Sequence, residues 1–220
     1  MSQLVFKFPF KTKYYEQDYY VSSNNFSAYR LIESWPNWPG KWVNIFGPKG
    51  CGKTHLSNIL KKKLNLVQIL DAKSINNETI LKFEKLDCLI IDNYEKNIDE
   101  KIFYSMLNQS KQVDNYMVIN SILPIRDIKF ELIDLKSRVQ SFVDLGIELP
   151  TDDLLRVIIS KYFSEKQIEI TPKISEYIIK NVERSYEKVF KFIKEIDDLS
   201  LSSGKSININ LIKKVLINNE

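Results

Sequence analysis

The sequence has little glycine, cysteine or histidine, and it contains no long apolar run. Its 220 residues include six glycines, two cysteines and one histidine. Cys51 and Cys88 are too few for a disulfide framework, and a zinc site would have to rely on carboxylates. No apolar stretch approaches the ~18 residues that a membrane-spanning helix needs, and the first ten residues do not form a secretory signal. We therefore expect a cytoplasmic protein with no membrane partner.

The composition is that of a folded chain with a sizeable core. Apolar residues make up 44% of the sequence and aromatic residues 12%, which excludes disordered and collagen-like chains. The 32 basic and 28 acidic residues give a net charge of +4. This mild charge neither requires nor excludes nucleic acid, and we expect any DNA contact to be weak or indirect.

Short apolar runs alternate with helical patterns up to residue 150. Strands are expected at 42–46, 66–70, 86–91, 116–119 and 141–145, with helices at 24–35, 53–64, 74–83 and 99–113. Near-continuous apolar strands separated by helices predict an α/β fold, with a five-stranded parallel sheet covered on both faces. After Pro150 only helical patterns follow, at 152–165, 172–182, 186–201 and 208–217. We expect an extended arm (1–13), an α/β domain (14–150) and a small helical lid domain (151–220).

Three of the six glycines lie in one loop between an expected strand and an expected helix. The segment Gly47-Pro48-Lys49-Gly50-Cys51-Gly52-Lys53-Thr54 matches the pattern G-x-x-x-x-G-K-[ST]. Glycines let successive backbone N–H groups curl around a phosphate, and the positive end of the following helix faces the same anion. Lys53 is expected to reach the terminal phosphates and Thr54 to bind Mg²⁺. The pattern therefore predicts a nucleotide site, against the alternative of a chance glycine-rich turn.

A second segment completes such a site. Leu89-Ile90-Ile91-Asp92 is an apolar strand that ends in an acid, as expected for a ligand that holds Mg²⁺. Many hydrolysing ATPases carry a second acid next, but here that position is Asn93. An amide can orient water but cannot accept its proton, and the loss of a general base typically costs ~10²–10⁴-fold in rate. We expect nucleotide binding with slow turnover.

Further segments resemble one family. Asp18-Tyr19-Tyr20-Val21 precedes the first helix, Ser121–Ile128 follows the fourth strand, and Leu135-Lys136-Ser137-Arg138 is an L-K-S-R tetrapeptide. With the phosphate loop and the Asp92-Asn93 pair, these segments run in continuous register from about Asp18 to Ile217. The chain resembles the AAA+ module of the bacterial replication initiator DnaA, and more closely the short DnaA homologues of the Hda type.

The resemblance implies an AAA+ P-loop fold that binds ADP or ATP with Mg²⁺. It places Tyr20 and Val21 on the adenine side, extends the phosphate loop through His55, and leaves Asn120 or Ser121 to contact the γ-phosphate. It also implies that Arg138 acts as a finger on the nucleotide of a neighbouring subunit. The implied role is regulatory: with the β sliding clamp, the protein promotes hydrolysis of DnaA-bound ATP and prevents re-initiation. A nucleotide-dependent homo-oligomer is a further expectation.

The chain also departs from the family pattern. Ile122 occupies an acid position, and Glu187 aligns with an arginine of the lid, flanked by Arg184 and Lys188. Together with Asn93, these residues predict weak or absent intrinsic ATPase activity. The sequence given ends at Glu220, where DnaA continues into a helix-turn-helix domain, and this favours the Hda-type interpretation. Two alternatives stay open: a hydrolysing ATPase of the helicase-loader type and a small-molecule P-loop kinase.

The first residues carry one more motif. Gln3-Leu4-Val5-Phe6-Lys7-Phe8 is similar to the glutamine-led peptide with which Hda and other replication proteins dock on the clamp. An extended peptide would place Leu4, Phe6 and Phe8 on one side, with Gln3 at the mouth of an apolar groove. The alternative is an edge strand that packs on the protein's own sheet.

Overall fold

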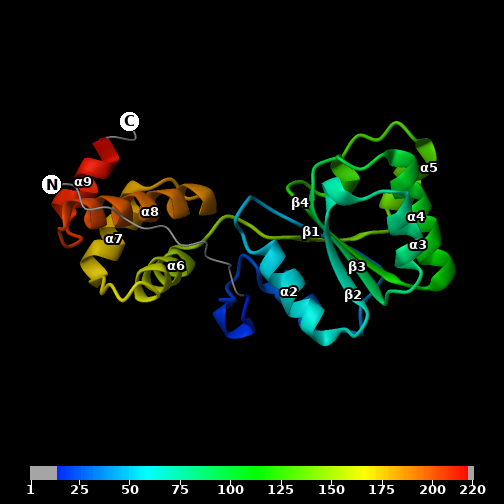
Figure 1. The fold of residues 1–220 in the computed structure, drawn as a ribbon, viewed down its shortest axis with the longest axis horizontal. Helices are drawn as coiled ribbons and strands as arrows, with labels where there is room; N and C mark the ends of the chain where they lie inside the picture. The colour runs from blue at the N-terminus through cyan, green and yellow to red at the C-terminus, as the bar shows by residue number, and fades with distance from the viewer. Residues whose placement is uncertain (1–13, 218–220) are drawn as a thin grey trace. The chain divides into compact units, whose positions relative to one another are not determined.

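A computed structural model describes residues 14–217 of the chain (Figure 1). The expected arm (1–13), with Gln3, Leu4, Phe6 and Phe8, lies outside the described residues. Internal contacts divide the described chain between Glu148 and Leu149 into two compact units, whereas the sequence places a domain boundary near Pro150. Within residues 14–217, no helix is both long enough and apolar enough to cross a membrane.

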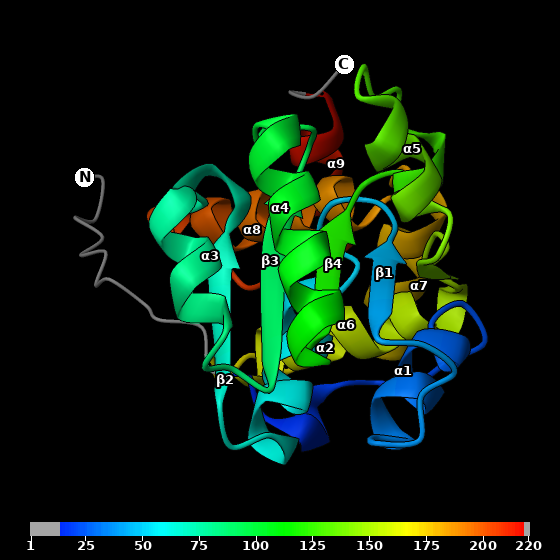
Figure 2. The same cartoon turned by 90° about the vertical axis from the view of Figure 1, so that its right-hand side faces the viewer.

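The first unit is built on a five-stranded parallel sheet. The strands are β1 (Trp42–Phe46), β2 (Val67–Asp71), β3 (Cys88–Tyr94), β4 (Tyr116–Ser121) and β5 (Val143–Gly146). Their order is β2-β3-β4-β1-β5, and each neighbouring pair is parallel. Figure 2 shows β1 and β4 running in the same direction. The carboxyl ends of all five strands therefore meet at one edge, where open α/β sheets bind their ligands.

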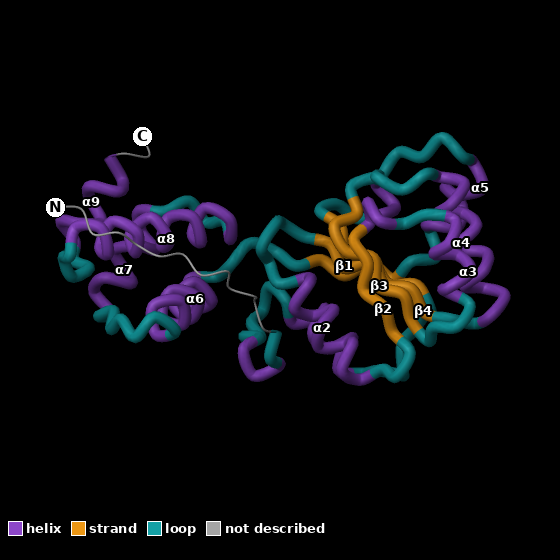
Figure 3. Tube along the Cα trace, in the orientation of Figure 1, coloured by secondary structure: helices purple, strands orange, loops and turns teal. Residues whose placement is uncertain are grey.

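Helices cover both faces of this sheet. They are α1 (Phe26–Glu33), α2 (Lys53–Lys63), α3 (Asn77–Phe83), α4 (Glu100–Val113) and α5 (Ile133–Val139). In Figure 3, α3, α4 and α5 lie on one side of the sheet and α2 on the other. Short 3₁₀ turns occur at Glu16–Asp18, Ala72–Ser74 and Ile125–Asp127. The expected α/β fold, with five parallel strands between two helical layers, is confirmed.

Alternate residues of the central strands form the core on each face. On the face covered by α3, α4 and α5, the buried strand residues include Leu89 and Ile91 of β3 and Met117 and Ile119 of β4, which pack with helix residues such as Phe103. Residues between them, such as Ile90 and Val118, are also fully buried. Strands buried on both faces explain the near-continuous apolar runs in the sequence.

The second unit is all helical in the part that the structure describes. It contains α6 (Asp152–Ser164), α7 (Pro172–Asn181), α8 (Tyr186–Ser203) and α9 (Ile209–Ile217). Its core gathers Leu155, Ile159, Phe163, Ile193 and Ile212, which are all at most 1% exposed. The unit also buries one charge, because Asp197 of α8 is 1% exposed and pairs with Lys166.

Two features of the first unit differ from the sequence-based expectation. The structure forms a helix, α5 (Ile133–Val139), that the sequence did not predict. Only Leu135 and Val139 of its seven residues are buried, so the apolar residues show no clear helical period. Strand β3 also continues past Asp92 to Tyr94. It does so through an irregularity between Ile91 and Tyr94, which alternation of apolar residues does not reveal.

Candidate functional site

The glycine-rich loop connects β1 to α2 at the carboxyl edge of the sheet. Gly47, Gly50 and Gly52 all have positive φ angles, at 154°, 82° and 98°. These values suit glycine because side chains with a Cβ rarely adopt them. Gly52 is the N-cap residue of α2, and no side chain caps the first N–H groups of this helix. An anion site at a helix N-terminus requires such N–H groups.

The loop is shaped for glycine by its neighbours as well. A Cβ on Gly47 would lie 2.5 Å from the Ile147 carbonyl oxygen, and a Cβ on Gly52 would lie 3.0 Å from the Tyr19 ring. The Gly47 N–H donates to the Ser121 carbonyl across 3.2 Å, which ties the loop to the end of β4. The loop is thus a narrow backbone cradle of the kind that holds phosphate.

Lys53 lies folded over this loop. Its Nζ donates to the carbonyl oxygens of Gly47, at 2.7 Å, and Pro48, at 3.0 Å. Burial raises the pKa of the neighbouring Cys51 thiol, while the Lys53 ammonium 3.6 Å away partly offsets this rise. Cys51 is therefore a neutral, space-filling side chain, and the positive charge of the loop comes from Lys53 and the exposed Lys49.

The structure brings Thr54 and Asp92 into direct contact. The Thr54 hydroxyl donates to Asp92 Oδ2 across 2.7 Å. The other oxygen, Oδ1, accepts from Asn120 Nδ2 at 3.1 Å and from the Asn93 N–H at 3.0 Å. A hydroxyl and a carboxylate are the hard oxygen donors that Mg²⁺ prefers. Residues far apart in sequence, on α2, β3 and β4, therefore form one donor set.

Asn120 joins this set more deeply than the sequence indicates. It is fully buried, and its Nδ2 also donates to Ser57 Oγ, at 2.8 Å. Its Oδ1 has no hydrogen-bond partner among the described residues, which is rare for a buried amide. Ile122, by contrast, is 45% exposed. Of the residues at the end of β4, Asn120 is the one that contacts Asp92, and Ser57 is a site neighbour that the motif did not reveal.

Asn44 is a second buried amide that sequence reasoning missed. It lies in the centre of β1 and donates to the Ile119 carbonyl, at 2.9 Å, and to Ser121 Oγ, at 2.8 Å. Its Oδ1 accepts the Ile125 N–H across 2.8 Å. One side chain therefore fixes the turn that follows β4. A lone asparagine within the apolar run of β1 was the available signal.

Replacing Asn44 by leucine is expected to lower the free energy of unfolding of the first unit. The Ile125 N–H would lose its acceptor, and a buried polar group left unpaired costs ~1–3 kcal/mol. Urea unfolding followed by circular dichroism measures the loss. Asn65→Ala is the matched control, because Asn65 is exposed and such changes stay within ~0.5 kcal/mol. Equal stability of the two variants would contradict the structural role of Asn44.

The segment before α1 lies against α2. His55 Nε2 is 2.7 Å from the Tyr15 carbonyl oxygen, and the Tyr19 ring packs edge-on against His55 and stacks on Tyr29. Tyr20 is 42% exposed, and its carbonyl accepts from Asn25 Nδ2 at 3.0 Å. Val21 is half-buried. The structure therefore gives His55 and Tyr19 a packing role, and it leaves the Tyr20 side chain open.

Arg138 lies in the last turn of α5 and is half-buried. Its guanidinium carbon lies 5.8 Å from the centre of the Tyr104 ring. Arg126, by contrast, pairs with Asp144 and donates to the Phe142 carbonyl. Among residues 14–217, Arg138 makes no ion pair with a carboxylate. The Tyr104 ring and the carboxyl end of α5 both favour a cation at this place.

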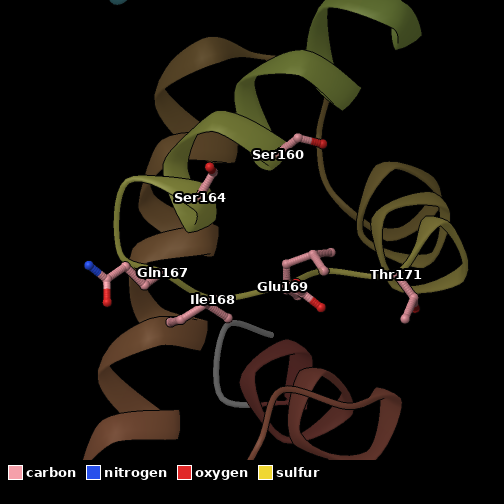
Figure 4. A pocket seen from close by; sticks show the side chains of 7 residues that line it. Ser160, Ser164, Gln167, Ile168, Glu169 and Thr171 are labelled. Atoms are coloured by element: carbon pink, nitrogen blue, oxygen red, sulfur yellow. The ribbon is translucent and has the colours of Figure 1, made fainter.

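The helical unit has its own polar groups. Arg184 pairs with Asp152 across 3.0 Å, whereas Glu187 lies exposed in the first turn of α8. A hollow of about 630 Å³ lies between the end of α6 and the start of α7. Figure 4 shows its polar lining, which includes Ser160, Ser164, Glu169 and Thr171. This lining has no phosphate loop and no metal-ligating set.

Comparison with known proteins places this site in a known fold. No protein-family model matches the chain. The chain is 26% identical to the chromosomal replication initiator DnaA of Buchnera aphidicola subsp. Baizongia pistaciae, over 98% of this chain. Domain III of Thermotoga maritima DnaA matches its fold with a TM-score of 0.78, over 96% of this chain and 98% of that chain, at 19% identity. The chain is similar to DnaA in sequence and shares the fold of its AAA+ module.

Other known proteins show the same similarity in sequence or in fold. The DnaA of Borrelia duttonii is 26% identical over 94% of the chain. AMPPCP-bound DnaA of Aquifex aeolicus gives a TM-score of 0.68 over 87% of this chain and 67% of that chain, at 21% identity. The RuvB branch migration motor of Thermotoga maritima gives 0.62 over 81% and 61%, at 20% identity. The chain spans about half the length of the curated relatives it matches.

Proposed function

We propose that this module binds ADP or ATP with Mg²⁺ at the carboxyl edge of its sheet. The observation that carries the proposal is the 2.7 Å contact between Thr54 and Asp92, directly beside the glycine cradle and Lys53. A helix N-terminus attracts phosphate, and a divalent cation held by hard oxygen donors binds the phosphate oxygens. The AMPPCP bound by Aquifex aeolicus DnaA supports the proposal.

Each residue has a distinct task in the proposed site. The N–H groups of the 47–54 loop and the amino end of α2 bind the phosphates, and Lys53 leaves its two loop carbonyls to pair with the terminal phosphate. Thr54 and Asp92 hold Mg²⁺, which supplies charge neutralisation of the phosphate oxygens. Asn120 holds Asp92 in place, and Asn120 or Ser121 would contact the γ-phosphate. Tyr20 and Val21 border the adenine.

We also propose a regulatory role rather than rapid turnover. Asn93 replaces the acid that would take a proton from water, which supports slow intrinsic hydrolysis. Arg138 has no carboxylate partner among the described residues, which supports its use on another protein's nucleotide. We infer that the partner is ATP-bound DnaA, engaged on the DNA-loaded β sliding clamp in the cytoplasm. A nucleotide-dependent homo-oligomer and weak or indirect DNA contact belong to the same proposal.

Pull-down of clamp and DnaA by the purified protein, with and without ADP, tests this role. We expect both partners to be retained and DnaA to depend on ADP. The protein's own turnover should stay far below the ~10 s⁻¹ that is typical of enzymes. Turnover at that level without DnaA binding would favour the alternative of a helicase-loader-type ATPase.

Residues 3–8 are expected to hold the clamp through apolar burial. Leu4 and Phe6 should each contribute ~1.5–3 kcal/mol if they are fully buried in a groove. Replacing Gln3, Leu4 and Phe6 together by alanine should release the clamp in surface plasmon resonance, while ADP binding persists. A Ser2→Ala variant serves as the control. Clamp binding by the triple variant at full strength would assign this segment to the protein's own fold.

A further inference from the structure

One face of helix α4 supports the segment that leads into α5. The ring of Phe103 packs against the ring of Phe130, with 6.3 Å between their centres. The Tyr104 ring lies 5.8 Å from the guanidinium carbon of Arg138. Glu100, the first residue of α4, contacts the backbone just before α5. Because residues at i, i+3 and i+4 share one face of a helix, these three side chains of α4 hold residues 130–138 together.

Glu100 accepts hydrogen bonds from two successive backbone N–H groups. Its Oε2 accepts from the Glu131 N–H at 2.9 Å and from the Leu132 N–H at 2.8 Å, and its Oε1 lies 3.1 Å from the Glu131 nitrogen. The side chain is 19% exposed, and Lys96 Nζ lies 3.5 Å from Oε1. The Leu132 N–H lowers the pKa of the Glu100 carboxyl, and Glu131 and Lys96 act in the same direction against the opposing effect of burial. An ionised carboxylate therefore holds this backbone at neutral pH.

Helix α5 depends on such support from outside. It has seven residues, whereas isolated helices shorter than ~12–15 residues are marginal in water. Its N-cap residue, Leu132, makes no side-chain hydrogen bond to the start of the helix. The buried residues Leu135 and Val139 anchor its middle and its end. The entry of α5 is therefore fixed by a side chain of another helix, and Glu100 supplies it.

We propose that Glu100 is a positioning residue that sets the direction of Arg138 toward the nucleotide of the partner. The inference rests on the proposed role of Arg138 and adds how this chain places that side chain. Glu100 fixes the start of α5, and Tyr104 contacts the guanidinium from the same face of α4. A misplacement of ~1 Å can cost ~10²-fold in rate, so an arginine finger on a short helix needs both contacts.

Substitutions at position 100 separate the reach of the side chain from its charge. Glu100→Gln keeps the length, and its carbonyl oxygen can accept both N–H groups that Oε2 accepts. Glu100→Asp keeps the charge but is one methylene shorter, so its carboxylate withdraws from Leu132. We expect the glutamine variant to retain most of the stimulation of DnaA and the aspartate variant to lose most of it. The reverse order would overturn the inference and assign Glu100 to electrostatic attraction of the partner.

The rate of ATP hydrolysis on DnaA, with clamp and DNA and at increasing concentrations of the module, tests the role of Glu100. Glu100→Ala should lower the maximal stimulated rate by ~10–10²-fold, while the concentration for half-maximal stimulation stays that of wild type. Glu84→Ala is the matched control, because Glu84 is exposed at the end of α3 and its replacement removes the same charge. An unchanged maximal rate in Glu100→Ala would overturn the inference, even with a raised half-maximal concentration.

Thermal shift with ADP shows that the variants are folded. Glu100→Ala should keep this shift, because the Glu100 carboxylate bonds to the 131–132 backbone and to Lys96. If the alanine variant lost its fold, the order of the glutamine and aspartate variants would still decide the matter. Loss of stimulation in Arg138→Ala but not in Glu100→Ala would overturn the inference alone. Wild type without stimulation of DnaA would overturn the proposed role of Arg138 and the inference together.

Discussion

Arg138→Ala should abolish the stimulation of ATP hydrolysis on DnaA while leaving the module's own nucleotide site intact. A guanidinium is permanently charged and forked, so it can bridge the negative charge that develops on phosphoryl oxygens. Arginine fingers supplied by a partner are worth ~10³–10⁵-fold in rate in well-studied nucleotide hydrolases. Because the Arg138 side chain makes no carboxylate ion pair within residues 14–217, its removal leaves no charge there unbalanced.

The measurement is DnaA-bound ATP hydrolysis in a mixture with clamp, DNA and the module. Lys136→Ala is the matched control. Lys136 is exposed on the same helix, and its replacement by alanine removes an equal charge. Arg138→Lys keeps the charge but loses the fork and should restore stimulation only in part. The alanine variant should keep its melting temperature, since a half-exposed contact with Tyr104 is worth ~0.5–1 kcal/mol. Stimulation that survives in Arg138→Ala would refute the finger.

Lys53→Ala should remove the stabilisation of the fold by ADP. A ligand at ~100 times its dissociation constant adds ~2.7 kcal/mol to the folded state, and the terminal phosphates would lose their direct cation. The variant should fold as wild type does, because the Lys53 hydrogen bonds, to the carbonyls of Gly47 and Pro48 and to Cys51 Sγ, all stay within the loop.

Differential scanning fluorimetry with and without ADP and Mg²⁺ measures this effect. Lys61→Ala, at the opposite end of α2, should retain the full shift because its exposed side chain lies in the last turn. Chelation of Mg²⁺ should weaken binding in wild type, since Thr54 and Asp92 would lose the ion that we propose they hold. A full shift in Lys53→Ala would remove the assignment of the phosphate loop.

Most helices and strands of the first unit could be predicted, because each of them follows from a local pattern of apolar residues. Strand β1 has the bounds that its apolar run indicates, Trp42–Phe46, and α2 begins at Lys53 as expected from the glycine before it. Helix α5 was not predictable in the same way. It has seven residues, two of them buried, and so short an element gives no clear helical period.

The candidate site also has a part that the sequence predicts and a part that it does not. The phosphate loop and Asp92 follow from consecutive residues, because the loop's backbone and the strand before it are local features. The partners of these residues are not local. Asn120 meets Asp92 and Ser57, and Asn44 meets Ile125, because β1, β3 and β4 lie side by side in an order that differs from their order in the chain.

The sequence by itself determined the phosphate loop, the parallel α/β layers and the replacement of an acid by Asn93. These properties depend on residue type, spacing and the period of apolar residues, which a single chain displays in full. Only the tertiary structure decided that Glu100 holds the backbone before α5 and that Arg138 makes no carboxylate ion pair within residues 14–217. The packing of α5 and of the segment before it against α4 brings these groups to their places. The physical reason is that strand order and side-chain direction depend on contacts between distant residues, which no local pattern encodes.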